Sequence, residues 1–142
     1  MVDTLLMVDD DPRDAALMAR ALKKAGITLD VVTVADGFEA LDYLLVRGKW
    51  GAREQSTPRA VILDLNLPGM HGLDVLREIR STASTKLVPV VILSSSSEES
   101  DVRTGYELGA NSYVQKPVDF DTFVEIAKQI GTYWSSVNLP HP

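Results

Sequence analysis

Apolar residues along the chain gather in five short runs, and each run is followed by a longer stretch with helical periodicity. The runs are rich in Val, Ile and Leu, which favour strands in segments of about four to eight residues. They cover residues 4–8, 29–35, 59–65, 87–94 and 111–115. Strands of this kind, each followed by a helix, predict a parallel sheet with both faces covered. The pattern therefore predicts an α/β fold with a doubly wound sheet of five parallel strands and five helices.

Residues that cap or interrupt helices mark the predicted helix ends. Asp11 is a candidate N-cap for the first helix, with Pro12 at its first position and Gly26 after its last turn. Asp119 is the corresponding cap of the last helix. The other helices are predicted after Asp36-Gly37 and near residues 72–80 and 98–108. The apolar stripe predicted to pack the last helix on the sheet consists of Phe120, Phe123, Val124, Ala127 and Ile130.

Length and composition fit one domain. The chain has 142 residues, of which 45% are hydrophobic and 24% charged, as is usual for a soluble globular domain. No repeat or second domain is evident, so we expect a single domain over residues 1–142. Its core is predicted at about 3–134, followed by a tail at 135–142. The polar segment 48–58 is predicted to be a loop, with Trp50 as its anchor.

Charge and residue usage exclude several classes of function. The net charge of −6 argues against nucleic acid as a main partner, because phosphate binding needs clustered Lys and Arg. Cysteine is absent, which excludes disulfides and thiolate metal sites. The N-terminal segment has no basic region, and its apolar run is too short for a signal peptide or a membrane helix. We therefore expect a soluble, cytoplasmic protein.

Chemically active side chains follow four of the five predicted strands. Asp9 and Asp10 follow the first strand, Asp64 ends the third, Ser94 ends the fourth and Lys116 follows the fifth. In an open α/β sheet the carboxyl ends of the strands meet at one edge, where ligands bind. Two carboxylates about 4 Å apart repel by roughly 4 kcal/mol at an effective dielectric near 20, so three of them call for a cation. All-oxygen ligands suit Mg²⁺, and a neighbouring Lys and Ser predict an anion that shares the metal, as in phosphoryl sites.

At these residues the sequence resembles the receiver domains of two-component response regulators. The matching segments are "MVDDDP", "ILDLNLPGMHG", "VVILSS" and "YVQKP", in that order along nearly the whole chain. Each segment is weak evidence alone, but four in order at matching strand ends are highly specific. The resemblance implies a flavodoxin-like sheet with strand order 2-1-3-4-5. It also implies that no external substrate is turned over.

The resemblance assigns a role to each residue at the predicted edge. It implies that Asp64 accepts a phosphoryl group from a histidine kinase as an aspartyl phosphate. Mg²⁺ would be held by Asp9, Asp10, Asp64 and the backbone carbonyl of Asn66. The phosphate contacts and the aromatic switch position would fall on Ser94, Ser95, Lys116 and Tyr113. His71 departs from the acidic or small polar residue that is common at its position.

Within this family the chain resembles stand-alone regulators that pair with phytochrome-type histidine kinases. The segments that carry this resemblance include "ALDYLLVRGKW", "YELGANSYVQKPVDF" and "YWSSVNLP". No output domain follows in the sequence, so we expect signalling through protein contacts. The resemblance also implies a homodimer through the fourth helix, fifth strand and fifth helix. The apolar residues expected on that face are Tyr106, Ile126, Tyr133 and Trp134.

Three other functions are weighed against this one. A degenerate receiver that acts only as a binding module is disfavoured, because every key residue is present. A haloacid-dehalogenase-like phosphatase needs a second Asp two residues after its nucleophile, where this chain has Asn66. A flavodoxin-like FMN carrier would place a phosphate loop after the first strand, where this chain has carboxylates. His71 and His141 are expected at the surface, without a metal role.

Overall fold

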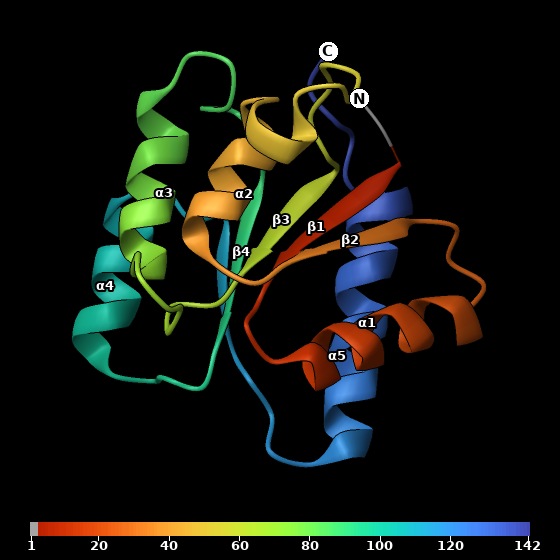
Figure 1. Cartoon of the computed structure of the whole chain (residues 1–142). Helices are drawn as coiled ribbons and strands as arrows, with labels where there is room; N and C mark the ends of the chain where they lie inside the picture. The colour runs from red at the N-terminus through yellow and green to blue at the C-terminus, as the bar shows by residue number, and fades with distance from the viewer. Residues whose placement is uncertain (1–2) are drawn as a thin grey trace.

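The computed structural model describes residues 3–142, and its centre is a sheet of five parallel strands (Figure 1). The strands are β1 (Thr4–Val8), β2 (Asp30–Val34), β3 (Ala60–Leu63), β4 (Val90–Ser94) and β5 (Ser112–Gln115). Their order across the sheet is β2-β1-β3-β4-β5, and all neighbouring pairs are parallel. The predicted fold class and strand order are therefore confirmed. The main boundary difference is at β4, which begins at Val90 because Pro89 has no N–H to donate to a neighbouring strand.

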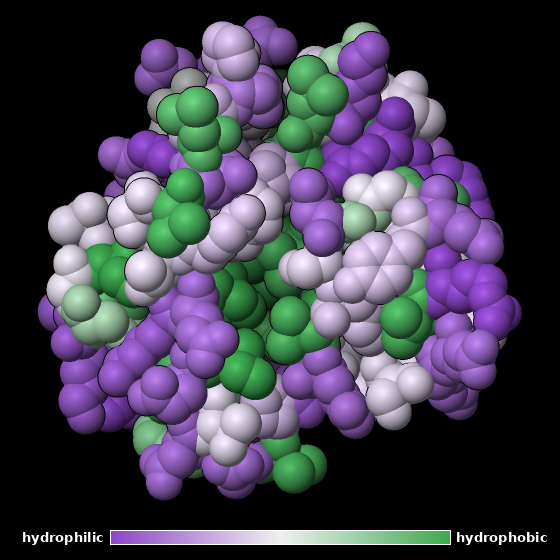
Figure 2. Space-filling model, turned by 180° about the vertical axis from the view of Figure 1, so that it is seen from behind, coloured by the Kyte–Doolittle hydropathy of each residue, from purple (hydrophilic) through white to green (hydrophobic). Residues whose placement is uncertain are grey.

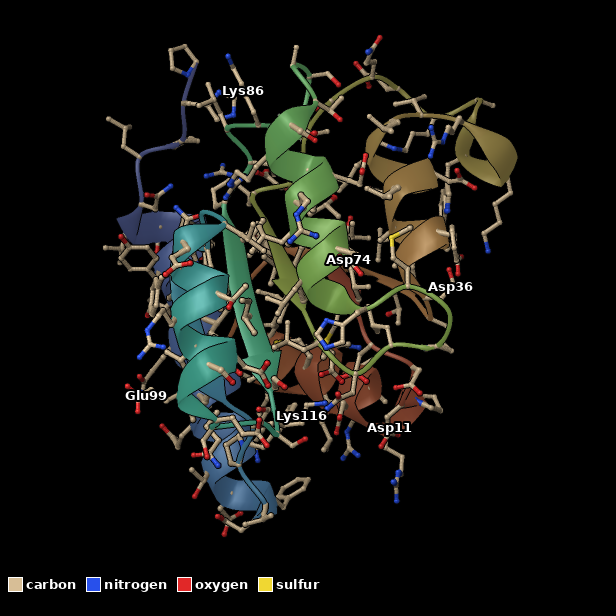
Figure 3. The ribbon with its side chains drawn as sticks, turned by 90° about the vertical axis from the view of Figure 1, so that its left-hand side faces the viewer. Asp11, Asp36, Asp74, Lys86, Glu99 and Lys116 are labelled. Carbon is tan, nitrogen blue, oxygen red and sulfur yellow. The ribbon has the colours of Figure 1, made fainter. Side chains whose placement is uncertain are left out.

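Five helices cover the two faces of this sheet. They are α1 (Pro12–Lys24), α2 (Gly37–Leu44), α3 (Gly72–Ser81), α4 (Glu99–Glu107) and α5 (Phe120–Thr132). Helices α1 and α5 lie on one face, and α2, α3 and α4 lie on the other (Figures 1 and 3). The caps predicted for α1 and α5 are confirmed, since Asp11 accepts from the N–H of Arg13 and Asp119 from that of Thr122. Among residues 3–142, no helix is both long and apolar enough to cross a membrane.

The sheet separates two hydrophobic cores. Successive side chains of a strand point to opposite faces, so Leu5 and Met7 of β1 pack against α1 and α5, whereas Leu6 and Val8 pack against α2 and α3. All five residues of β1 are buried. The polar segment after α2 contains a short 3-10 helix, η1 (Gly48–Trp50), which Trp50 anchors by packing edge-on against Tyr43 at a centroid distance of 4.9 Å.

The C-terminal end of the chain corrects two predictions. Helix α5 continues into a π-helical turn, η2 (Tyr133–Val137), so helical structure extends beyond the predicted core boundary at residue 134. Trp134 was predicted on the exposed dimer face, but it is only 7% exposed and packs into the core between α1, α5 and the sheet. Because helical structure continues past α5, Trp134 lies four residues after Ile130 on the stripe that packs against the sheet.

Phe120 also departs from its prediction. It was expected on the core stripe of α5 with Phe123, yet it is 57% exposed while Phe123 is buried. Phe120 is the first residue of α5 and lies before the helix reaches the sheet. It therefore joins the surface around the loop after β5.

The loops that follow the strands lie together at one edge of the molecule. The C-terminal end of the chain lies at the opposite edge, near the top of Figure 1, and the strands run toward the lower edge. Lys116 and Asp11 lie at this lower edge in Figure 3, far from Lys86 near the upper edge. The fold thus gathers the residues predicted to carry chemistry on a single rim.

Candidate functional site

Asp9 is the first residue past β1, and the sheet fixes its backbone. Its N–H donates to the carbonyl of Val34 at 3.1 Å, which extends the pairing with β2 by one residue. The side chain is buried, and its Oδ1 accepts from the N–H of Asp11 at 2.9 Å. Asp10 follows with an exposed side chain. The end of a buried strand therefore presents one enclosed carboxylate and one that reaches solvent.

Asp64 lies beside Asp9 at the end of β3. Its N–H donates to the carbonyl of Val8 at 3.0 Å, and its side chain is buried. The loop after it is held close, because Gly72 at the start of α3 packs directly on Asp64. A Cβ at Gly72 would lie only 2.2 Å from the Asp64 carbonyl oxygen, so a larger residue would displace the Asp64 backbone. Asn66, the predicted carbonyl ligand, is exposed in this loop.

Lys116 joins the carboxylates from the far end of β5. Its backbone N–H donates to the Ser94 carbonyl at 2.7 Å, which aligns it with the end of β4. Its Nζ donates to Asp9 Oδ2 at 2.9 Å and to Asp64 Oδ2 at 3.1 Å. Lys116 is separated from Asp9 by 107 positions in sequence, so only the tertiary fold makes this contact.

A fourth carboxylate, from Asp14, completes the surroundings of Lys116. Asp14 Oδ2 accepts from Lys116 Nζ at 2.9 Å. Sequence reasoning missed Asp14 because it examined the residues that directly follow strands, whereas Asp14 lies in the first turn of α1. The position of Asp14 in the sequence could have indicated this contact, since the first turn of a helix that follows a strand also faces the carboxyl edge of the sheet.

The electrostatics of the site are dominated by burial and by these carboxylates. Burial raises the pKa of Asp9 above its ordinary value, and the charge of Asp64 adds to this rise, although hydrogen bonds from Asp11 and Lys116 oppose it. Burial lowers the pKa of Lys116, but hydrogen bonds to Asp14 and Asp9 and the charges of Asp64 and Asp9 outweigh burial and raise it. Lys116 is therefore a cation, and burial disfavours the ionised form of Asp9.

Three of the carboxylates form a cluster that can hold a metal ion. One oxygen each from Asp9, Asp10 and Asp64 lies within 4.8 Å of the others. An all-carboxylate donor set of this size fits a hard divalent cation such as Mg²⁺, which takes few protein carboxylates and completes its shell with water and phosphate. The cluster predicted from the strand ends is thus brought together, and Asp14 lies outside it.

The predicted phosphate-contacting residues lie around the ends of β4 and β5. Ser94 is fully buried, and its Oγ accepts from the N–H of Ser96 at 3.2 Å. Ser95 is exposed. Tyr113 is half-buried, and its hydroxyl donates to the Ser96 carbonyl at 2.8 Å. Burial also raises the pKa of the Tyr113 hydroxyl, which is therefore protonated and able to donate.

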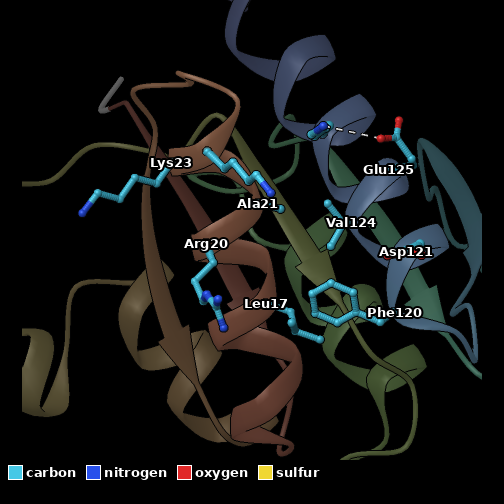
Figure 4. A pocket seen from close by; sticks show the side chains of 10 residues that line it. Leu17, Arg20, Ala21, Lys23, Phe120, Asp121, Val124 and Glu125 are labelled. Carbon is cyan, nitrogen blue, oxygen red and sulfur yellow. Dashed lines mark hydrogen bonds and ion pairs between the residues drawn. The ribbon is translucent and has the colours of Figure 1, made fainter.

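A groove of about 690 Å³ lies between α1 and α5, away from the acid cluster (Figure 4). Apolar side chains of Leu17, Phe120 and Val124 line it together with charged residues, among them Arg20 and Glu125. None of the cluster carboxylates lines this groove. This groove is therefore separate from the acid cluster.

The predicted dimer-face residues are unevenly exposed. Tyr106 is 50% exposed and Tyr133 is 46% exposed. Ile126 is half-buried and packs against the core, and Trp134 belongs to that core. Figure 2 shows hydrophobic side chains gathered in a hollow on the face that carries α4 and α5. The exposed part of the predicted face is thus formed by the two tyrosines.

Comparison with known proteins agrees with this geometry. A family model described as the response regulator receiver domain matches residues 5–128. Response regulator Rcp1 of Synechocystis sp. is 33% identical over 137 residues, covering 96% of this chain and 92% of the relative. The residues matched by the family model include Asp9, Asp64 and Lys116.

Solved structures extend the comparison to shape. The phosphorylated cyanobacterial phytochrome response regulator RcpA superposes with a TM-score of 0.91 at 36% identity, and 98% of each chain is covered. The bacteriophytochrome response regulator RtBRR has a TM-score of 0.78 at 45% identity, with 100% of this chain and 86% of that chain covered. The Mn²⁺-bound form of Rcp1 has a TM-score of 0.90 at 30% identity, with 98% and 99% covered. Because the family model matches residues 5–128 and the fold agrees with these structures, the chain belongs to the receiver-domain family of response regulators.

Proposed function

We propose that this protein is a phosphoryl-accepting response regulator in which Asp64 is the phosphoacceptor and Mg²⁺ the required metal. The observation that carries the proposal is the convergence of Asp64, two further cluster carboxylates and the Lys116 ammonium at one rim. A buried carboxylate next to a cation is a suitable nucleophile for phosphorus. The resemblance to RcpA, which has been solved in phosphorylated form, supports the same reading.

Each residue of the site would have its own role in phosphoryl transfer. An Asp64 carboxylate oxygen would form the new bond to phosphorus as the bond between phosphorus and a histidine nitrogen of the donor breaks. The electron pair of that bond stays on the imidazole nitrogen, which is then protonated. Mg²⁺, held by Asp9, Asp10, Asp64 and the Asn66 carbonyl, would supply positive charge for the phosphoryl oxygens. Lys116 would bind one phosphoryl oxygen, and the Ser94 hydroxyl would donate to another after leaving the Ser96 N–H.

Intact-mass measurement with a small phosphodonor tests this proposal. With Mg²⁺ and acetyl phosphate, the wild type is expected to gain the mass of one phosphoryl group, and Asp64→Asn is expected to gain none. Asp74→Asn is the matched control, because Asp74 is an exposed aspartate that pairs with Arg77 and lies outside the acid cluster. Undiminished modification of Asp64→Asn would refute the assignment of the phosphoacceptor.

The family assignment bears on the alternative functions. A haloacid-dehalogenase-like phosphatase has no support, because the chain belongs to the receiver family and has Asn66 in place of the second Asp. We also propose that the protein turns over no external substrate and acts in the cytoplasm, where ATP supplies a kinase. A degenerate receiver would fail the phosphorylation test, so the same experiment separates the two remaining readings.

We propose a phytochrome-type histidine kinase as the phosphodonor. The support is the similarity to RcpA and RtBRR, both described as phytochrome response regulators. Phosphotransfer from a panel of purified histidine kinases tests this pairing. Transfer from a phytochrome-type kinase at least about tenfold faster than from unrelated kinases is expected, and equal rates across the panel would contradict it.

We propose a two-fold symmetric homodimer through α4, β5 and α5. Tyr106 and Tyr133 are exposed on this face, and a groove of about 390 Å³ lies beside Tyr133 at the free edge of β5. Val137 and Leu139 extend the apolar surface, being 64% and 91% exposed. Exposed apolar residues that adjoin a groove are typical of protein contacts. A second copy of this chain fits the closed symmetry that most homo-oligomers adopt.

A further inference from the structure

Asp14 stands apart from the other carboxylates of the rim. It comes from the first turn of α1 rather than from a strand end, and it is not among the three residues whose oxygens cluster for a metal. Its side chain is 18% exposed, and its Oδ2 lies 2.9 Å from Lys116 Nζ. This is as short as the contact from Asp9 and shorter than the 3.1 Å contact from Asp64.

The three contacts account for every donor of Lys116. An ammonium group carries three N–H donors, and here each has a carboxylate acceptor. Two of these acceptors, Asp9 and Asp64, also belong to the metal cluster, whereas Asp14 does not. A divalent cation that enters the cluster competes with Lys116 for Asp9 and Asp64, whereas Asp14 lies outside the cluster and can keep its contact with Lys116.

We propose that Asp14 is a positioning residue that retains Lys116 when a divalent cation takes Asp9 and Asp64, and thereby strengthens metal binding. The inference rests on the proposed function, because the metal and the phosphoryl group use the same cluster. With one donor on Asp14, Lys116 keeps two donors for oxygens at Asp64. Its ammonium stays beside the phosphoacceptor instead of turning outward to water.

Loss of Asp14 is expected to weaken metal binding for two reasons. Without Asp14, Lys116 has only cluster carboxylates as partners, so it competes directly with the incoming cation. Removal of a negative charge near the cluster also lowers its attraction for any cation. The second effect is common to every nearby aspartate, whereas the first requires contact with Lys116. A matched charge removal can separate them.

Asp11→Asn is that matched control. Asp11 lies at the start of the same helix, and its carboxylate pairs with Arg13 rather than with Lys116. Asn is as good an N-cap as Asp, so the helix is preserved. Both substitutions remove one charge, and only Asp14→Asn removes a partner of Lys116.

Mg²⁺ affinity, followed by backbone amide shifts of residues 64–66 in NMR, tests the inference. Asp14→Asn is expected to bind Mg²⁺ about five- to tenfold more weakly than the wild type, and Asp11→Asn less than about twofold more weakly. In a Lys116→Met background, adding Asp14→Asn is expected to have no more effect than Asp11→Asn. Asp14→Glu, which restores the charge, is expected to recover most of the affinity.

The ammonium group of Lys116 gives a second readout. In the wild type with saturating Mg²⁺, its protons are expected to exchange slowly enough to give an NMR signal, and Asp14→Asn is expected to lose that signal. Equal affinities for Asp14→Asn and Asp11→Asn, or an effect of Asp14→Asn that persists without Lys116, would overturn the inference. If the wild type itself shows no Mg²⁺-dependent shifts at residues 64–66, the proposed function fails instead.

Discussion

The hydroxyl of Tyr113 donates a 2.8 Å hydrogen bond to the backbone carbonyl of Ser96 and so links β5 to the loop before α4. The Ser96 hydroxyl donates to Asp101 of α4 at 2.6 Å, and the Ser96 N–H donates to Ser94 Oγ. Ser96 is therefore the point at which Tyr113, Ser94 and α4 meet. A movement of the Ser94 hydroxyl toward a phosphoryl group is expected to weaken its bond with Ser96 and so affect this junction.

Tyr113→Phe tests the junction. The substitution removes one hydrogen bond with little change in shape, so local opening of the loop is expected to cost about 1 kcal/mol less. Amide hydrogen exchange at Ser96 and Glu98 is then expected to quicken by roughly fivefold. Tyr106→Phe is the control, because Tyr106 is exposed and its hydroxyl has no hydrogen bond within residues 3–142. Unchanged exchange in Tyr113→Phe would show that this bond does not hold the loop.

Asp10→Ala tests the repulsion within the acid cluster. Removal of one carboxylate relieves repulsion with Asp9 and Asp64, so the metal-free variant is expected to melt a few degrees above the wild type. Mg²⁺ is expected to raise the melting temperature of the wild type by binding the folded state, and to leave Asp10→Ala unchanged. Asp121→Asn removes an exposed aspartate of α5 and is expected to keep the Mg²⁺ response. An Asp10→Ala protein that retains the full response would place the metal elsewhere.

The raised pKa of Asp9 predicts that the free energy of unfolding depends on pH. Because burial raises its folded-state pKa above 3.8, its contribution to stability is fully present below pH 3.8 and is lost as pH rises through the folded-state pKa. The unfolding free energy of Asp9→Asn, minus that of the wild type, is therefore expected to increase as pH rises from that range to neutrality. Urea denaturation with a chelator at several pH values measures this difference.

Asp11→Asn serves as a control of opposite sign. Hydrogen bonds from Arg13 lower the pKa of Asp11, so its contribution is present at neutral pH and is lost as pH falls through the folded-state pKa. The unfolding free energy of Asp11→Asn, minus that of the wild type, is therefore expected to decrease as pH rises. Parallel trends in the two variants would contradict the assignment of a raised pKa to Asp9.

His71 stands where an acidic or small polar residue is common, and in this structure it acts as the N-cap of α3. Its Nδ1 accepts from the N–H of Leu73 at 3.1 Å, at the start of the helix that packs on Asp64 through Gly72. His71→Ala is expected to lower the unfolding free energy by about 1 kcal/mol, whereas His71→Asn preserves a cap and is expected to cost less. Urea denaturation measures both, and equal stability of the two variants would exclude the capping role.

A test of the dimer must leave Trp134 in place, because this residue is buried in the core. Light scattering at micromolar concentration is expected to give twice the monomer mass for the wild type and a reduced mass for Tyr133→Asp. Truncation after Gly131 would remove a core residue, so removal of residues 139–142 is the better deletion. Phe38→Asp, at an exposed residue on α2, is the control and is expected to leave the mass unchanged. A monomeric wild type, with or without phosphorylation, would refute the dimer.

The sequence by itself determined the fold class and most of the rim. Apolar strand segments that alternate with helices predict a parallel sheet with both faces covered, and parallel strands place their carboxyl ends at one edge. Asp9, Asp64 and Lys116 follow such runs directly, so their convergence could be predicted without coordinates. The caps at Asp11 and Asp119 were equally readable, because capping is local.

Only the tertiary structure decided which side chains on helices and turns join the site or the core. Asp14 reaches Lys116 because α1 packs against the sheet and α5, which brings its first turn to the end of β5. Trp134 is buried because helical structure continues past α5, so that it extends the stripe of Phe123, Ala127 and Ile130 instead of joining the dimer face. Contacts of this kind join residues that are distant in the sequence, such as the 102 positions between Asp14 and Lys116, so no local pattern specifies them.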